Sequence, residues 1–521
     1  MWTSPHAKRL VFLVHRWTAV AACVLMALWV FSGVVMLFVG YPKLLPSEHL
    51  RALPSLSTAQ CCLPVESALK HSPSPDKVQQ LTLTTIAGRP SYRLKEADGT
   101  LRVVDAGTGA VAPPPDDATV LHSARAFASG ANGVLQGRTQ DDRWTHSALL
   151  NPHRPLIKVQ MDDSASSMLY ISSSTGEVVM DVPRHQRYWN YVGAWLHWVY
   201  MFRDGSRDPA WSWLVIGLSA LGTLSAITGI FVGIWRWRFN GRYKSGSKTP
   251  YREFQMRWHH ITGLVFGAVM TCWIFSGLMS MNPLGLFSPQ GTRPDLRAYQ
   301  QAVPGATSFG LSTHQALTLL DAQGFDTREV EWKWLNGQPY LLAFDGAGDT
   351  RVLPANAVAP KVERALEQSL LEQAAQRLLP FAIRSTAWLN EYDAYYYRRG
   401  EASMYAAAAR ELPVLRVQFE DPGNTIVYIS PYSGDVVLSL DRSQRTGRWL
   451  FNFLHSWDLP WMLRSAWTRD VMLVLLSLGA FALAFTGIVL GYRRLKLFIS
   501  HKLRSLPGPY RTTAQPRVPS P

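Results

Sequence analysis

The sequence predicts a membrane protein with four transmembrane α-helices, arranged as a tandem two-fold repeat, and two α+β domains outside the membrane. Three observations support this fold class: four long apolar runs without charge, basic residues concentrated in three short segments, and two halves of the chain that match each other. Together they exclude a purely soluble, disordered or disulfide-framework protein for these 521 residues.

The apolar runs predict the membrane helices. Each run is 21 to 25 residues long, and none contains a charged residue; they cover 17–39, 211–235, 261–281 and 471–492. A helix needs about 20 apolar residues to cross a bilayer core of about 30 Å. We therefore expect transmembrane helices over 17–39, 210–235, 258–281 and 470–492. The first run is too long for the apolar part of a signal peptide, and no small-x-small cleavage site follows it, which favours a retained anchor.

The charge distribution predicts the topology. Residues 1–16, 236–257 and 493–521 together hold 17 basic residues and 1 acidic residue, while the rest of the chain holds 35 and 36. Lys and Arg are enriched in the cytoplasmic segments of membrane proteins. We therefore expect a multi-pass protein of the bacterial inner membrane, with the N-terminus, the basic middle loop and the C-terminus in the cytoplasm. The charge indicates contact with the lipid bilayer, and no nucleic-acid partner is expected.

Regions 40–209 and 282–469 are then expected in the periplasm, as the two α+β domains. Apolar alternation bounded by Gly turns predicts paired strands. These are 91–94 with 101–104, 156–161, 168–172 and 177–180 in the first region, and 340–344 with 351–353, 415–419, 426–429 and 435–438 in the second. Amphipathic helices are expected over 59–70, 312–322 and 360–379, the last opening with Pro360 because proline suits a first helical position. Residues 493–521 are expected to form a basic, Pro-rich tail.

The chain matches itself at two offsets, which indicates an internal repeat. A shift of 244 aligns the first and third apolar runs, so that His15 meets His259. A shift of 258 aligns the ends of the two halves, so that His197 meets His455. Each half is therefore expected to consist of a helix, an outer domain and a second helix.

Four of the 14 histidines recur at equivalent positions beside membrane helices. His15 and His259 begin the first and third helices on the cytoplasmic side, whereas His197 and His455 precede the second and fourth helices on the outer side. Helix pairs related by a pseudo-two-fold axis would bring each pair together. Two facing imidazoles from different helices are what a six-coordinate haem b requires. The sequence thus predicts two haem sites with these four residues as axial ligands of the iron.

Other interpretations of these histidines stay open. A histidine at a helix end is commonly an interfacial residue or a cap, and duplication copies residues whatever their role. His260 lies next to His259 and points about 100° away around the helix. It is either the actual ligand or a group that supports the ligand.

The sequence carries no signature of another redox cofactor. No nucleotide-binding glycine pattern follows a strand, so neither a flavin nor an NAD site is expected in this chain, and no catalytic residue is identified. Electrons are therefore expected from a cytoplasmic reductase or from a membrane quinol. The equivalent acidic turns at 162–163 and 420–421 are either cation sites or ordinary turns, and the adjacent Cys61 and Cys62 leave a vicinal disulfide open.

The whole arrangement resembles the PepSY-associated transmembrane proteins, often called iron-regulated membrane proteins of the inner membrane. The resemblance covers about residues 8–500 and rests on the His15-Arg16-Trp17 and Trp258-His259-His260 starts, and on the Leu-His and Thr-Gly-Ile segments of both halves. The Tyr-Ile-Ser strands and the Gly turns after them look like the closing hairpins of PepSY domains. The resemblance implies that 40–209 and 282–469 are PepSY-like domains.

Some members of that family are haem-containing ferric-siderophore reductases. The resemblance implies an oxidoreductase in which His15 and His259 hold an inner haem and His197 and His455 an outer one. Its substrate would be a ferric siderophore or another iron chelate, reduced on the periplasmic side to release iron. The fused cytoplasmic flavin domain of some relatives is not recognised in this sequence. The alternative is a non-enzymatic, membrane-anchored PepSY protein that regulates a protease or the cell envelope.

Overall fold

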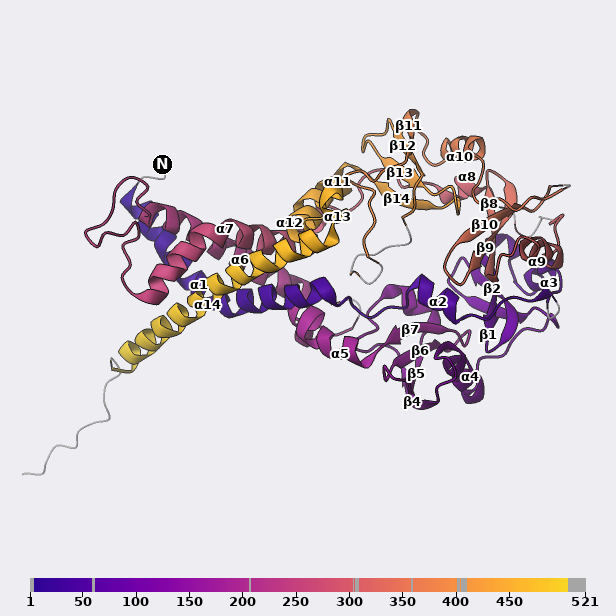
Figure 1. Ribbon diagram of the computed structural model, residues 1–521, viewed down its shortest axis with the longest axis horizontal. Coiled ribbons are helices and arrows are strands. Elements are labelled where there is room, and N and C mark those ends of the chain that lie inside the picture. The colour runs from indigo at the N-terminus through magenta and orange to yellow at the C-terminus, as the bar shows by residue number, and fades with distance from the viewer. Residues whose placement is uncertain are drawn as a thin grey trace, which may run out of the picture. The chain divides into compact units, whose positions relative to one another are not determined.

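The protein is described by a computed structural model over residues 4–504, except 59–60, 206–207, 303, 305–308, 358, 401–402 and 404–409. The chain divides into two compact units (Figure 1). The helical unit is drawn from Met1–Val34, Leu214–Met281 and Asp470–Pro521, and the sheet unit from Val35–Trp213 and Asn282–Arg469. The part of the predicted tail beyond residue 504 lies outside the described residues.

Four helices of the described chain are long and apolar enough to cross a membrane. They are α1 (Pro5–Phe38), α6 (Pro209–Arg236), α7 (Phe254–Ser280) and α14 (Ala466–Arg504). All four include most of a predicted apolar run, and α1 and α14 extend well beyond it into basic sequence. The start of α7 is fixed by Glu253, whose carboxylate accepts hydrogen bonds from the first free N–H groups of the helix.

The core of the helical unit is built from small and flexible side chains. Ala22 and Met26 of α1 pack in one buried cluster with Met270 of α7 and with Ala480 and Ala484 of α14. Small residues let membrane helices approach closely, which favours their association where lipid offers no hydrophobic driving force.

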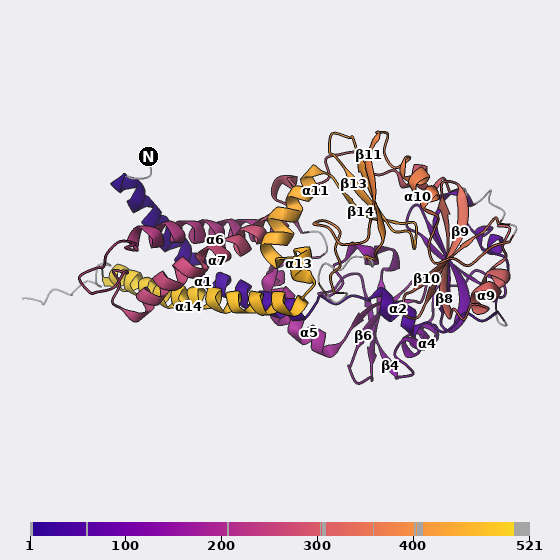
Figure 2. The same cartoon turned by 45° about the horizontal axis from the view of Figure 1, so that its top comes forward.

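The two halves of the chain share a six-stranded antiparallel sheet in the sheet unit, in the order β10-β9-β8-β1-β2-β3. Its strands are β1 (Val78–Ile86), β2 (Arg89–Glu96), β3 (Leu101–Asp105), β8 (Thr327–Leu335), β9 (Gln338–Asp345) and β10 (Thr350–Pro354). The halves meet where Leu81 of β1 pairs with Trp332 of β8. The short helix α3 (Val65–Leu69) and α9 (Thr313–Asp321) pack on one face of this sheet, and Figure 2 shows α9 beside β8.

Each half also contributes a four-stranded sheet. The first has the order β4 (Gly133–Thr139), β5 (Leu156–Met161), β6 (Met168–Ser172), β7 (Val178–Val182), and the second has β11 (Ile383–Leu389), β12 (Val414–Phe419), β13 (Ile426–Ile429), β14 (Val436–Leu440). Helix α4 (Asp117–Phe127) packs on the first sheet, and α10 (Gln368–Ala375) packs in one core with the second. The hairpins predicted in both regions are confirmed by these strand pairs.

Two of the predicted helices are shorter than expected. Pro360 does not open a helix: Glu363 pairs with Val352 beside β10, and the helix starts only at Gln368. Within the predicted 59–70, the described helix is α3 alone. The helix predicted over 312–322 is confirmed as α9. It begins after Ser312, whose side chain caps it by accepting a hydrogen bond from the backbone N–H of Gln315. Cys61 and Cys62 form a disulfide between adjacent residues.

Candidate functional site

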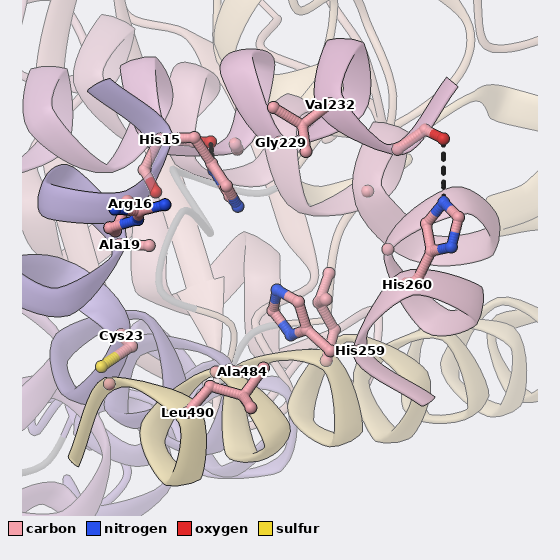
Figure 3. A pocket seen from close by; sticks show the side chains of 18 of the residues that line it. His15, Arg16, Ala19, Cys23, Gly229, Val232, His259, His260, Ala484 and Leu490 are labelled. Atoms are coloured by element: carbon pink, nitrogen blue, oxygen red, sulfur yellow. Dashed lines mark hydrogen bonds between the residues drawn. The ribbon is translucent and has the colours of Figure 1, made fainter. Parts of the chain in front are cut away.

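His15 of α1 and His259 of α7 face one another in the helical unit. Their ring centroids are 6.4 Å apart, and the two ring planes differ by 29°. Figure 3 shows the two imidazoles pointing toward each other from different helices. The structure therefore brings together the two residues that the 244-residue offset pairs.

Hydrogen bonds fix how these imidazoles are oriented. The Nδ1 of His15 lies 3.0 Å from the carbonyl of Ser225, which only accepts, so Nδ1 carries the proton. The Nδ1 of His259 lies 3.1 Å from Oγ1 of Thr486, whose own proton goes to the carbonyl of Leu483. Nδ1 of His259 is therefore also the donor. We assign both neutral rings a free lone pair at Nε2.

A mostly apolar cavity of about 380 Å³ is lined by both histidines. Cavities that bind small molecules and cofactors have volumes of about 300–1,000 Å³ and present few polar groups. All lining residues belong to the helical unit, and the apolar wall includes Met26, Met270 and Leu490.

Gly229 and Gly487 match at the 258-residue offset, and each lies beside one of the imidazoles. The space left for a side chain differs between them. A Cβ added at Gly229 of α6 would lie 2.8 Å from Cε1 of His15. A Cβ added at Gly487 of α14 would lie 3.5 Å from Cε1 of His259, which is an ordinary contact. The missing side chain at Gly229 thus makes room for the observed position of His15.

His260 is held in a different way from its neighbour. Its Nδ1 lies 2.7 Å from Oγ1 of Thr249, and its Nε2 lies 2.8 Å from the carbonyl of Gly233. Both ring nitrogens are therefore engaged, although the residue reaches the cavity wall. Figure 3 shows His259 opposite His15 and His260 to one side of that pair. His260 is bonded to Thr249 of the loop before α7 and to Gly233 of α6.

His197 and His455 form a second pair, in the sheet unit. Their ring centroids are 6.0 Å apart, with the planes at 77°. His197 follows a π-helical turn over Tyr191–Trp195, and His455 follows another over Arg448–Phe453. Single π-helical turns are rare and frequently occur at functional sites.

A left-handed residue follows each of these histidines by two positions. Val199 has a φ of 56°, and Trp457 has a φ of 50°. Such a conformation is unfavourable for bulky or β-branched residues, and it persists only where the surrounding structure holds it. The local backbone around His197 and His455 is thus equally unusual in both halves.

The side chains that support this backbone differ between the halves. Next to His455, the buried carboxylate of Asp458 accepts hydrogen bonds from Arg448 at 3.0 Å, and also from Arg399 and Tyr397. Burial, together with the nearby carboxylate, raises the pKa of Tyr397 to about 12. This cluster ties the segment after His455 to the preceding loop.

The corresponding positions of the first half hold neutral residues. Asn190 stands 258 residues before Arg448 and donates to the carbonyls of Gly40 and Gln186. Tyr200 stands 258 residues before Asp458, and its ring packs 5.1 Å from that of Trp198. Aromatic packing therefore replaces the ion pairs next to His197.

The two acidic turns use their carboxylates within the turns themselves. Asp163 accepts from the backbone N–H and the hydroxyl of Ser167, at 2.7 and 2.9 Å. Asp421 accepts in the same way from Thr425, at 2.6 and 2.7 Å. These bonds account for the repeated aspartates as turn-forming residues.

Several residues around the histidines were not anticipated from the sequence. Arg16 and Arg494 line the cavity of the helical unit, and Ser225 and Thr486 orient its imidazoles. Two signals were present: Arg16 adjoins His15, and Thr486 belongs to the Thr-Gly-Ile segment that occurs in both halves.

The four candidate spans and the matched family define a multi-pass membrane protein. Residues 12–315, which are more than half of the chain, match the family described as the PepSY-associated TM region. The chain belongs to that family, which confirms the resemblance found in the sequence. No curated protein matches the chain.

Proposed function

We propose that this protein is a di-haem electron-transfer protein of the bacterial inner membrane. It acts as an oxidoreductase that reduces a ferric siderophore, or another iron chelate, in the periplasm and so releases the iron. The observation that carries this proposal is the facing pair of His15 and His259 across an apolar cavity.

The separation of the two imidazole rings in each histidine pair fits a metal ion that both rings would share. Two imidazoles that share one metal ion between them would have ring centroids about 6.2 Å apart, given metal–nitrogen bonds of about 2 Å and about 1.1 Å from the nitrogen to the ring centre. The separation is 6.4 Å for His15 and His259, and 6.0 Å for His197 and His455. Both separations therefore support one haem b per pair, and at the inner pair the apolar cavity supports it as well.

The supporting hydrogen bonds favour the same assignment. A metal-binding histidine usually donates its other ring N–H to a carbonyl or hydroxyl, which fixes the ring and its tautomer. His15 and His259 have such bonds, to Ser225 and Thr486. His260 has no ring nitrogen left over, so we propose His259 as the ligand and His260 as a supporting residue.

The proposed chemistry is the transfer of single electrons across the membrane. Haem iron, when bound, supplies this chemistry by alternating between its ferric and ferrous states. The chain's own residues orient the imidazoles through Ser225 and Thr486, and the apolar side chains of the wall set the polarity of the cavity. One electron converts the Fe(III) of the chelate to Fe(II), which hard oxygen ligands bind less tightly. A quinol would release two electrons and two protons, and a cytoplasmic reductase would supply electrons alone.

The proposal includes the orientation in the membrane. The basic segments 1–16, 236–257 and 493–521 support a cytoplasmic location for both termini and the middle loop. The sheet unit would then lie in the periplasm, where it would meet the chelate. Both halves contain three strands, a helix and four strands in the same order, which supports the proposed tandem two-fold repeat.

Visible absorption spectroscopy tests the proposal. The full chain is expressed with added haem, purified in detergent and measured oxidised and dithionite-reduced, with haem quantified per chain. We expect close to two haems. His259→Gln should lose the inner haem, while the adjacent control His260→Gln should keep it. His455→Ala should lose the outer haem together with chelate reduction.

The outcomes separate the two candidate functions. A colourless protein would refute the electron-transfer proposal and leave the non-enzymatic PepSY binding or regulatory function. Retention of both haems and of chelate reduction in His455→Ala would refute the assignment of the outer site. If the protein holds one haem per chain, the proposal would be limited to the histidine pair whose variant loses that haem.

A further inference from the structure

The cavity of the helical unit has a cationic edge. Among the described residues that line it, the charged ones are Arg16 of α1 and Arg494 of α14. Both side chains are exposed, and neither forms an ion pair with any part of the chain that the structure describes. Two guanidinium groups therefore stand at the mouth of a mostly apolar space.

The two arginines border the space between the imidazoles. Arg16 follows His15 directly, so it points about 100° away around α1. Figure 3 shows Arg16 to one side of His15, next to Ala19. Arg494 lies one turn beyond Leu490, on the face of α14 that lines the cavity. Trp17, the residue after Arg16, lies 5.5 Å from the ring of Phe498, one turn beyond Arg494, so both cations line the cavity where α1 packs beside α14.

The equivalent edge in the other half has no lining cation. The offset of 244 pairs Arg16 with His260, whose ring nitrogens are both hydrogen-bonded. The offset of 258 pairs Arg494 with Arg236, whose guanidinium lies 5.0 Å from the ring centre of Phe12 and does not line the cavity. The two halves therefore supply matching imidazoles but unequal charge.

We propose that Arg16 and Arg494 bind the carboxylates of the planar ligand held between His15 and His259, namely the two propionates of haem. This inference rests on the proposed function. Guanidinium groups pair with carboxylates through parallel N–H···O bonds. Because the cations lie on one edge, they fix the rotation of the ligand about the axis between the imidazoles. An anionic lipid headgroup would use the same pairing, and the experiment below distinguishes the two.

A ligand-side comparison tests the proposal. Full-length protein from haem-depleted cells is titrated in detergent with haem and with haem dimethyl ester, in which both carboxylates are blocked. The measured quantity is the ratio of the ester's Kd to that of haem at the inner site, in a His455→Ala background. The variants are Arg16→Gln/Arg494→Gln and, as a control, Arg493→Gln. Arg493 neighbours Arg494 but pairs with Glu253 at 2.9 Å and does not line the cavity.

We expect the ratio to fall about tenfold in the double variant, or about threefold for each partly exposed ion pair. Arg493→Gln should keep the ratio of its His455→Ala parent. An unchanged ratio in the double variant would overturn the proposal and assign the two cations to lipid contact. If the double variant does not fold, the threefold fall is sought in Arg494→Gln, whose side chain is exposed, and its absence overturns the proposal equally. A parent protein that binds neither ligand would instead refute the proposed function.

Discussion

The glycine beside His15 gives the sharpest test of the inner site. In Gly229→Ala, the added methyl would meet Cε1 of His15 at 2.8 Å, whereas contacts become ordinary only at about 3.4 Å. The ring must therefore retreat by about 0.6 Å. A shift of that size away from α6 lengthens the 3.0 Å contact between Nδ1 and the Ser225 carbonyl to beyond hydrogen-bond length.

The magnitude follows from two opposing terms. Alanine favours a helix over glycine by about 1 kcal/mol. Overpacking of a well-filled site costs about 1–3 kcal/mol. Gly487→Ala gains the first term without the second, because its methyl would lie 3.5 Å from His259. The two variants should therefore differ in free energy of unfolding by about 1–3 kcal/mol, with Gly229→Ala the less stable.

The assay compares the two variants in detergent, by thermal unfolding midpoint and by haem per chain with the reduced absorption spectrum. Gly487→Ala should resemble the wild type, and Gly229→Ala should unfold earlier and hold the inner haem less tightly or with an altered spectrum. Equal midpoints and equal haem content in the two variants would refute the reasoning, because they would show that His15 moves freely.

Two further predictions concern the sheet unit. Burial opposes a charge on His49, but the Glu329 carboxylate at 3.3 Å raises the pKa of His49, with Arg93 and Glu177 also nearby. Since the pKa of His49 is raised in the folded state, the pair stabilises the fold fully below about pH 6.5 and loses this effect as the pH rises through the raised pKa. The thermal unfolding midpoint should therefore decline over that range, and His49→Gln should flatten the decline. An unchanged pH profile in His49→Gln would contradict this role of the pair. Asp421→Ala removes three hydrogen bonds in a buried turn and should cost about 2–4 kcal/mol, seen as an earlier denaturant midpoint; an unaltered midpoint would show that the turn forms without the carboxylate.

The membrane helices were predictable because their signal is local. Each crossing is a run of apolar residues without charge, and the bilayer leaves few alternatives to a helix there. The helix ends were less predictable, since they depend on single contacts such as the cap that Glu253 provides. The strands β5, β6 and β13 were also predictable, because alternation and Gly turns bound them on both sides.

The central strands of the shared sheet were missed for a physical reason. Strands β1 and β8 pair with each other across about half of the chain, and no local pattern encodes that partner. Strand β8 also carries Glu329 and Glu331 at buried or half-buried positions, which a sequence pattern assigns to solvent. Their burial becomes favourable only once His49 and Gln80 arrive from the other half.

The candidate site was predictable in its pairing but not in its detail. The expected topology and the match between the two halves of the sequence sufficed to pair His15 with His259. They did not distinguish His259 from His260, because both lie on one helix, a residue apart. That distinction depends on Thr249, which reaches His260 from the middle loop, and on Thr486 of α14, which orients His259. The repeated Thr-Gly-Ile segment marks Thr486, but nothing in the sequence links Thr486 or Thr249 to one histidine rather than the other.

The comparison of the two halves separates what the proposed chemistry needs from what merely supports it. At the outer pair, the histidines and the left-handed residues after them recur at the 258-residue offset, while the supports have changed from Asn190 and Tyr200 to Arg448 and Asp458. Duplication alone would copy the histidine, but it would not by itself bring the two copied rings to 6.0 Å from each other. The segments that carry the two imidazoles are anchored by unlike contacts, yet the two rings face each other as one pair. This is the pattern expected if each half supplies one of two ligands to a single metal.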